Sequence, residues 1–219
     1  MINDLPSPLG LLGGTFDPVH LGHLRAAIEV AEACDFSKVY LIPVGIPPHK
    51  MRSDLTPFEH RLKMIKLAIE DAAQLGVLEI EGQRQGPSYT IDTLNYFNSK
   101  GIETYFILGS EAFLEIHTWK SCQELFNLSH FIVLLREEMH KKNIPEYLKN
   151  LGLEIASKEN DELFLHSGKK VLFFRPTRLE VSGSQLRSIL RKGGSIKFLV
   201  PEKVLQYITE NRLYLNEVH

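Results

Sequence analysis

Two histidines, His20 and His23, follow a glycine pair and are the side chains of this sequence best suited to phosphate chemistry. Gly13 and Gly14 have no side chains, so the backbone can turn sharply there and a ligand can approach it closely. The Asp-Pro dipeptide after them is a helix-start signal and predicts a helix over residues 18–34. Histidines three apart share one face of its first turn, where free N–H groups and the positive dipole end favour an anion. The spacing therefore predicts a phosphate site with two imidazole proton donors, in preference to histidines that only cap or pack.

The segments around this motif predict an α/β fold. An apolar run at 9–12 precedes the glycine pair, and residues 38–43 form a second predicted strand rich in β-forming side chains. Strand, helix and strand in this order predict a right-handed βαβ unit with a parallel sheet. Such sheets bind ligands beyond the carboxyl ends of their strands, where the glycine turn lies. Further strands are expected at 77–80, 103–108, 131–135 and 171–174, and further helices at 57–70, 88–97, 184–190 and 200–208.

We expect residues 1–219 to form a single Rossmann-like, doubly wound domain with a mainly parallel sheet and helices on both faces. A C-terminal helical part, at about 182–219, is expected to pack on it. No internal repeat or long linker points to a second domain. Residues 137–170 are the least informative and predict a polar loop, a short amphipathic helix and a solvated charge run at 158–162.

The composition is that of an ordinary globular protein and excludes several classes. Hydrophobic residues make up 43% of the chain, charged residues 24%, and the formal net charge is −2. This balance gives no electrostatic footprint for nucleic acid, and no apolar run reaches the length of a membrane span. Two cysteines form neither a disulfide framework nor a CxxC metal site. We see no secretion signal and expect a cytoplasmic protein without nucleic-acid or membrane partners.

Two later helix starts offer further anion sites. A Pro-Ser pair precedes Tyr89 and Thr90, where a helix start would supply free N–H groups, although an ordinary capped helix is an equally good interpretation of these residues. Ser182 or Ser184 can cap the helix that follows, with Arg187 three residues after Ser184 on the same face. Taken alone, this second motif is better interpreted as a capped surface helix with solvated arginines.

Four other positions are expected to face the same crevice. Lys50 ends a loop stiffened by two prolines that follows the second predicted strand, although an isolated lysine is usually only solvated. Gly109 and Glu111 follow the segment most typical of a strand, where a carboxylate can accept hydrogen bonds from a ribose diol. Trp119 is the only tryptophan, and packing in the core is as good an interpretation as ligand contact.

Several of these strings carry a resemblance to a known family. GGTFDPVHLGHL at 13–24 resembles the bacterial nicotinate-mononucleotide adenylyltransferase family of the HxGH nucleotidyltransferase superfamily. The short HxGH tetrad is shared with cytidylyltransferases, pantetheine-phosphate adenylyltransferases and class I aminoacyl-tRNA synthetases. PPHK at 47–50, SYTIDTL at 88–94 and VSGSQLR at 181–187 are also similar to that family's segments, so the resemblance spans nearly the whole chain. Glu111 departs from the family's aspartate, and Gly183 replaces a serine.

The resemblance implies transfer of the adenylyl group of ATP to nicotinate mononucleotide, which gives nicotinate adenine dinucleotide and pyrophosphate in NAD biosynthesis. It implies His20 and His23 as the catalytic pair and Mg²⁺ held through the ATP phosphates, with no metal ligands from the protein. Tyr89, Thr90 and Trp119 are implied to contact the mononucleotide. The residues implied to bind ATP are Gly13, Gly14, Thr15, Phe16, His20, His23, Lys50, Gly109, Glu111, Ser182, Ser184 and Arg187.

Two other functions stay open at this point. The acceptor could be nicotinamide mononucleotide or phosphopantetheine, since the first motif is shared among such enzymes. A non-catalytic nucleotide-binding module would keep the same phosphate site and release no pyrophosphate. The sequence leaves open whether the chain forms a homo-oligomer.

Overall fold

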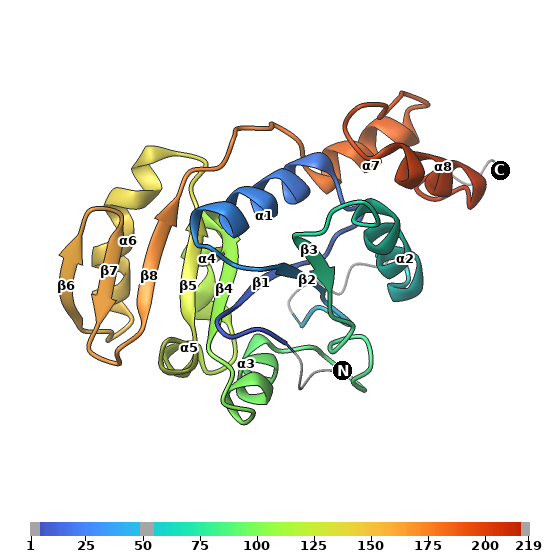
Figure 1. The fold of residues 1–219 in the computed structure, drawn as a ribbon. Coiled ribbons are helices and arrows are strands. Elements are labelled where there is room, and N and C mark those ends of the chain that lie inside the picture. The colour runs from blue at the N-terminus through green and yellow to red at the C-terminus, as the bar shows by residue number, and fades with distance from the viewer. Residues whose placement is uncertain (1–4, 49–54, 216–219) are drawn as a thin grey trace.

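The computed structural model describes residues 5–48 and 55–215, which form one sheet with helices on both faces (Figure 1). The strands are β1 (Leu9–Gly14), β2 (Val39–Pro43), β3 (Leu75–Val77), β4 (Thr104–Gly109), β5 (His130–Leu134), β6 (Ile155–Glu159), β7 (Glu162–Leu165) and β8 (Lys170–Phe174). The helices are α1 (Leu21–Ala33), α2 (Phe58–Ala68), α3 (Thr90–Asn98), α4 (Ser110–Leu114), the 3₁₀ turn η2 (Ile116–Thr118), α5 (Cys122–Leu128), α6 (Glu138–Asn150), α7 (Gly183–Arg191) and α8 (Glu202–Glu210).

The sheet has the order β3-β2-β1-β4-β5-β8-β7-β6. Its first six strands are parallel to one another, and β7 and β6 run antiparallel at one edge. The chain proceeds from β1 to β3 in one direction and then returns to place β4 on the other side of β1. The predicted doubly wound, mainly parallel fold is therefore confirmed. The strand order reverses between β1 and β4, the point at which such sheets bind ligands.

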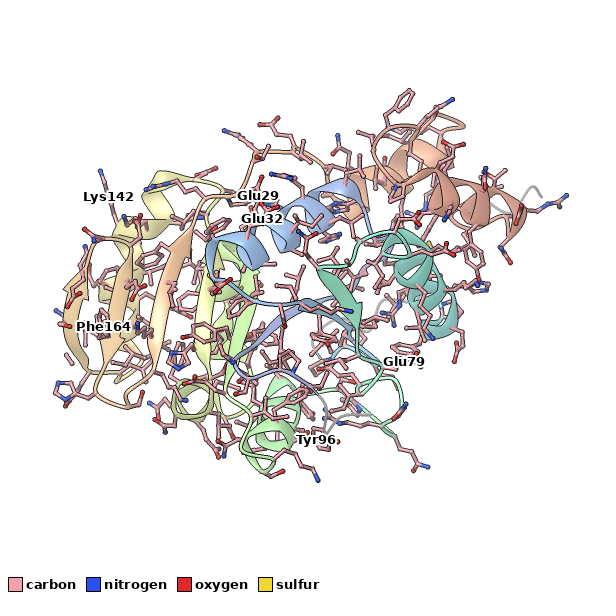
Figure 2. The ribbon with its side chains drawn as sticks, in the orientation of Figure 1. Glu29, Glu32, Glu79, Tyr96, Lys142 and Phe164 are labelled. Atoms are coloured by element: carbon pink, nitrogen blue, oxygen red, sulfur yellow. The ribbon has the colours of Figure 1, made fainter. Side chains whose placement is uncertain are left out.

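Alternating side chains of the central strands divide the core into two layers. Phe106 and Leu108 of β4 pack with α3, α4, α5 and α6 on one face of the sheet. Ile107, between them, packs with α1, α2, α7 and α8 on the other face. This division follows from the period of two in a strand. Charged side chains such as Glu32 on α1 and Lys142 on α6 lie on the outer surfaces of their helices (Figure 2).

Helix α1 begins at Leu21 and ends at Ala33, so the predicted start near residue 18 is wrong. The residue that caps the helix is His20, in extended conformation, and His23 is the third residue inside. Asp17 does not cap the helix, because its carboxylate accepts a hydrogen bond from the hydroxyl of Tyr214 at 2.7 Å. The two histidines therefore flank the first turn of α1, one as its cap and one within it.

Residues 155–165 form the hairpin of β6 and β7, in a part of the chain where the sequence predicted no strand. Lys158 and Glu159 are exposed, in agreement with the predicted solvation of 158–162, whereas Asp161 and Glu162 are partly buried, and Leu163 and Leu165 are buried against the sheet. An edge hairpin packs only one of its faces against the rest of the protein. Polar residues on the other face therefore interrupt the apolar run that would predict a strand. The strand expected at 77–80 lies slightly earlier, as β3. None of the described helices is both long and apolar enough to cross a bilayer.

Candidate active site

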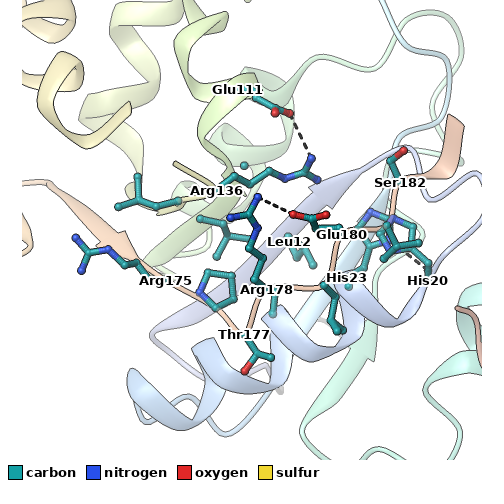
Figure 3. A pocket seen from close by; sticks show the side chains of 18 of the residues that line it. Leu12, His20, His23, Glu111, Arg136, Arg175, Thr177, Arg178, Glu180 and Ser182 are labelled. Carbon is teal, nitrogen blue, oxygen red and sulfur yellow. Dashed lines mark hydrogen bonds and ion pairs between the residues drawn. The ribbon is translucent and has the colours of Figure 1, made fainter. Parts of the chain in front are cut away.

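Two cavities meet where β1 and β4 end, and Gly13 and Gly109 line both of them. The larger, of about 780 Å³, contains His20 and His23 and is called the histidine cavity below (Figure 3). The smaller, of about 290 Å³, contains Trp119 and is called the tryptophan cavity. Together they offer two adjoining compartments at the carboxyl edge of a parallel sheet.

The imidazole rings of His20 and His23 stack, with centroids 3.6 Å apart and planes 21° from parallel. His23 Nδ1 accepts a hydrogen bond from the backbone N–H of His20 at 3.3 Å, so the neutral His23 ring carries its proton on Nε2. Phe16 packs its ring edge-on against His23, with centroids 5.0 Å apart. His20 Nδ1 is buried, and no residue of the described chain forms a hydrogen bond with it. These contacts hold both rings at the wall of the histidine cavity.

Burial lowers the pKa of His20 to about 4, and the nearby positive charge of Arg136 contributes to this shift. The pKa of His23 is also well below its usual value, because of burial and then because of His20 and Arg136. Both rings are therefore neutral at physiological pH in the ligand-free protein. A neutral imidazole still donates one N–H, which suits hydrogen bonding to a phosphate oxygen without a permanent charge.

Arginines face the histidine cavity from two segments that the fold brings together. Arg136 follows β5 and lies 3.6 Å from Glu111 at the start of α4. Arg178 lies in the connection from β8 to α7 and pairs with Glu180 at 2.6 Å. Both pairs are drawn in Figure 3 and are largely exposed. Arg136 and Arg178 therefore present positive charges to the cavity. Each is paired with a carboxylate that is itself exposed to solvent.

The connection 175–182 is fixed to α1 by Glu29. The Glu29 carboxylate accepts hydrogen bonds from the backbone N–H of Thr177 at 2.7 Å and from its hydroxyl at 2.5 Å. These bonds lower the pKa of Glu29 against the raising effect of its burial. The wall of the cavity that carries Arg175 and Arg178 is thereby attached to the helix that carries His23.

The start of α7 adds backbone donors to the same cavity. Ser182 caps the helix as predicted, since its hydroxyl accepts the backbone N–H of Gln185 at 3.3 Å. The Ser184 hydroxyl lies 3.2 Å from that of Ser182. Ser182 and Gln185 line the histidine cavity, so the positive end of this helix opens toward it.

Arg187 is buried, whereas its motif taken alone indicated a solvated arginine. The residue is 6% exposed and does not line either cavity. It donates a hydrogen bond to the backbone carbonyl of Asp17 and lies 3.7 Å from the Asp17 carboxylate. In this structure Arg187 holds the segment before His20 and does not face the cavity.

The tryptophan cavity is bordered by aromatic rings and by the first residues of α3. Trp119 packs edge-on against Phe106, with ring centroids 6.2 Å apart. Tyr89 caps α3 and Thr90 is its first residue, and both line the cavity. Lys120 lies 4.5 Å over the Tyr89 ring. An aromatic wall next to the free N–H groups of a helix start suits a planar ring that carries an anionic substituent.

Arg61 joins the segments that follow β1 and β2, a role that its sequence position did not reveal. It is 1% exposed, and burial lowers its pKa. Its guanidinium donates to the backbone carbonyls of Thr15 at 2.8 Å, Gly45 at 3.0 Å and Thr56 at 2.9 Å. Arg61 thereby ties the glycine turn after β1 to the loop after β2.

The structure brings most of the predicted site residues into these two cavities. Those that line the histidine cavity are Gly13, His20, His23, Gly109, Glu111 and Ser182, and those that line the tryptophan cavity are Gly13, Gly14, Thr15, Tyr89, Thr90, Gly109 and Trp119. Phe16, Ser184 and Arg187 line neither cavity, and Lys50 lies outside the described residues.

Arg175 and Arg178 line the histidine cavity, and the sequence analysis did not single them out. They follow the apolar run 171–174, which the sequence predicted as a strand. The rule that ligands bind beyond the carboxyl ends of parallel strands would have pointed to both of them.

Comparison with known proteins shows the family and the fold of the chain. Residues 11–189 match a family model described as cytidylyltransferase-like. A probable nicotinate-nucleotide adenylyltransferase from Desulfatibacillum aliphaticivorans is 42% identical, over 94% of this chain and 99% of the relative. A protein with the same description from Pelobacter propionicus is 38% identical, over 94% and 97%. The Plasmodium falciparum nicotinic acid mononucleotide adenylyltransferase in complex with NaAD has the same fold, with a TM-score of 0.71, 20% identity and coverage of 95% of this chain and 98% of that one.

Proposed function

The chain belongs to the cytidylyltransferase-like family and, within it, to the nicotinate-nucleotide adenylyltransferases, and we propose that its two adjoining cavities hold the two substrates of that reaction. The protein transfers the adenylyl group of ATP to nicotinate mononucleotide, which gives nicotinate adenine dinucleotide and pyrophosphate. The observation that carries the assignment of the site is the meeting of the cavities at Gly13 and Gly109, next to the stacked histidines. A phosphate of each substrate can reach the other at that junction.

We assign ATP to the histidine cavity and nicotinate mononucleotide to the tryptophan cavity. The larger volume, the exposed arginines and the start of α7 suit a triphosphate. The smaller cavity offers Trp119 to a pyridine ring and the start of α3 to its carboxylate. Hydrogen bonds to an ionised group are stronger than those to a neutral one, so this end of the site favours the acid over the amide.

The chemistry needs no nucleophile from the protein, because the attacking group is itself an anion. An oxygen of the mononucleotide 5′-phosphate forms a bond to the α-phosphorus of ATP in line with the leaving group. The bond between that phosphorus and its bridging oxygen breaks, and the electron pair leaves with pyrophosphate. The protein contributes position and stabilisation of the charge that grows on the leaving group. The neutral His20 and His23 rings donate N–H groups to those phosphate oxygens.

Other groups hold the leaving phosphates and their counter-ion. We assign Ser182, Ser184 and the first N–H groups of α7 to the β- and γ-phosphates, and keep Lys50 as a further ligand. Among the described residues, no cluster of three or more His, Cys, Asp or Glu side chains could hold a metal ion. We propose that a Mg²⁺ ion is held by the ATP phosphates, where it would neutralise part of their charge.

We also place the enzyme in a reducing compartment, the cytoplasm. Cys34 and Cys122 are both free thiols in the structure, and each is only partly buried. Burial raises the pKa of Cys34, which keeps that thiol protonated and unreactive.

Release of pyrophosphate from ATP, measured with three acceptors, tests the proposal. Nicotinate mononucleotide should support turnover with a kcat/KM at least about tenfold above that of nicotinamide mononucleotide, because one charged hydrogen bond contributes about that factor. Phosphopantetheine should give no signal above background. Preference for the amide or for phosphopantetheine would overturn the assigned acceptor, and ATP binding without pyrophosphate release from any acceptor would indicate a non-catalytic module.

A further inference from the structure

Glu81 is a buried carboxylate that lines the tryptophan cavity and that the chemistry described above does not use. It is 6% exposed and lies in the loop between β3 and α3. A buried charge is costly unless hydrogen bonds or opposite charges compensate it. Its surroundings supply both.

A chain of hydrogen bonds joins Glu81 to the first turns of α3. The Thr93 hydroxyl, which is fully buried, donates to Glu81 Oε1 at 2.8 Å. Arg84 Nη1 donates to the same hydroxyl oxygen at 2.8 Å. Burial raises the pKa of Glu81, while the Thr93 bond, the charge of Arg84 and the Gly45 amide act in the opposite direction. The Glu81 carboxylate is thus held by α3 on one side and faces the loop after β2 on the other.

That loop, residues 44–48, lies directly on the Glu81 segment. A Cβ atom at Gly45 would come within 2.4 Å of the Glu81 carbonyl oxygen and 2.7 Å of the Ser88 hydroxyl, so a side chain is not tolerated there. The backbone N–H of Ser88 donates to the carbonyl of Ile46 at 2.8 Å. Arg61 holds Gly45 from the opposite side. Close contacts and hydrogen bonds therefore connect this loop to the Glu81 segment.

On the basis of the function proposed above, we propose that Glu81 is a positioning residue for the mononucleotide. Through Thr93 and the Gly45 loop, its carboxylate fixes the distance between the two walls of the tryptophan cavity, α3 and residues 44–48. The positions of Tyr89 and Thr90, which lie at the start of α3 and line the cavity, depend on that distance. Since Glu81 does not line the histidine cavity, it acts on the mononucleotide and leaves ATP binding unchanged.

Steady-state kinetics with ATP and nicotinate mononucleotide varied in turn test this proposal. Glu81→Gln keeps the shape of the side chain but removes its charge, so it weakens the bond from Thr93. Thr93→Val removes the hydroxyl that donates this hydrogen bond. Each variant should raise the KM for the mononucleotide about tenfold, the usual effect of losing one hydrogen bond to a charged group, and should change the KM for ATP less than about twofold. Thr93→Ser, which keeps the hydroxyl, should restore the wild-type value.

Two controls separate this role from general effects on the fold. Glu79→Gln, two residues away, removes a carboxylate whose ion pair with Lys66 is in contact with solvent, and it should leave both KM values unchanged. Turnover by the wild-type protein establishes the proposed function independently of any variant. If Glu81→Gln does not fold, Thr93→Val and Thr93→Ser carry the same comparison. Equal changes in both KM values, a lower mononucleotide KM in Glu81→Gln, or a Thr93→Val variant that behaves like the wild type would overturn the proposal.

Discussion

The Arg187 guanidinium and the Asp17 carboxylate form a buried ion pair at 3.7 Å, between positions 170 residues apart in the chain. Both side chains are almost inaccessible to solvent, at 7% exposure for Arg187 and 1% for Asp17. The Tyr214 hydroxyl binds the same carboxylate at 2.7 Å. Helix α7 and the segment after α8 therefore hold the peptide that leads into His20, so the position of the two stacked histidines depends on residues far along the chain.

Replacing Arg187 with alanine should destabilise the protein strongly. The change leaves the Asp17 carboxylate buried without its cation, a loss of about 3–5 kcal/mol in the free energy of unfolding. Urea denaturation monitored by circular dichroism measures it. Arg178→Ala is the matched control, since its ion pair with Glu180 is 74% exposed on both sides and should contribute less than about 1 kcal/mol. Equal small losses in the two variants would contradict the structural role of Arg187.

The stability of the protein should fall in mild acid because His20 is buried in neutral form. The pKa of His20 is about 4 in the folded state, against 6.5 for an unperturbed histidine, so below pH 6.5 the unfolded state binds a proton that the folded state excludes. The stability that the neutral His20 ring contributes is fully present above pH 6.5 and is lost as the pH falls toward 4. Between pH 7 and pH 5 it amounts to about 2 kcal/mol.

Urea denaturation of the wild type and of His20→Asn, at pH 7 and at pH 5, measures this effect. The comparison separates the contribution of His20 to the free energy of unfolding from that of other titrating groups. The wild type should lose about 2 kcal/mol more than the variant on going to the lower pH. Identical losses in both proteins would show that His20 titrates normally in the folded state.

Trp119 is the only tryptophan in the chain, so its fluorescence reports on the tryptophan cavity alone. Nicotinate mononucleotide should quench this emission in a saturable manner, because the assignment proposed above puts its pyridinium ring against the indole. ATP without the mononucleotide should leave the emission nearly unchanged. Quenching by ATP alone would contradict the assignment of the two cavities.

A companion variant measures the contribution of the indole ring to binding. Trp119→Phe keeps an aromatic ring against Phe106 but has a weaker interaction with a cation. It should raise the KM for the mononucleotide by about threefold to tenfold, with the KM for ATP unchanged. A rise in the KM for ATP of the same size would show that Trp119 does not act on the mononucleotide alone.

Local signals in the sequence were sufficient where neighbours along the chain decide the structure. The spacing of His20 and His23 predicted that their rings share one face at the helix start, and Ser182 or Ser184 was predicted to cap α7, where Ser182 is the cap. The order of strand, helix and strand over residues 9–43 predicted a parallel sheet with the site at its carboxyl edge. In these cases hydrogen bonding and periodicity act over a few residues, so the sequence alone contains the information.

Predictions from the sequence were wrong where the place of a residue depends on a partner far along the chain. Asp17 resembles a helix cap, but Arg187 and Tyr214 engage it, which moves the start of α1 to Leu21. Arg61 lies on a helix whose other charges are solvated, and its burial depends on carbonyl groups of three separate loop residues. No local pattern in the sequence distinguishes such an arginine from a solvated one.

The rate of pyrophosphate release by His23→Ala, with ATP and nicotinate mononucleotide both saturating, tests the central claim most directly. The claim is that His23 donates a hydrogen bond to the phosphates while charge grows on the leaving group. We expect kcat to fall by about 10²–10³, the effect of removing one such donor, while the unfolding midpoint stays close to that of the wild type. A folded variant that turns over at nearly the wild-type rate would contradict it.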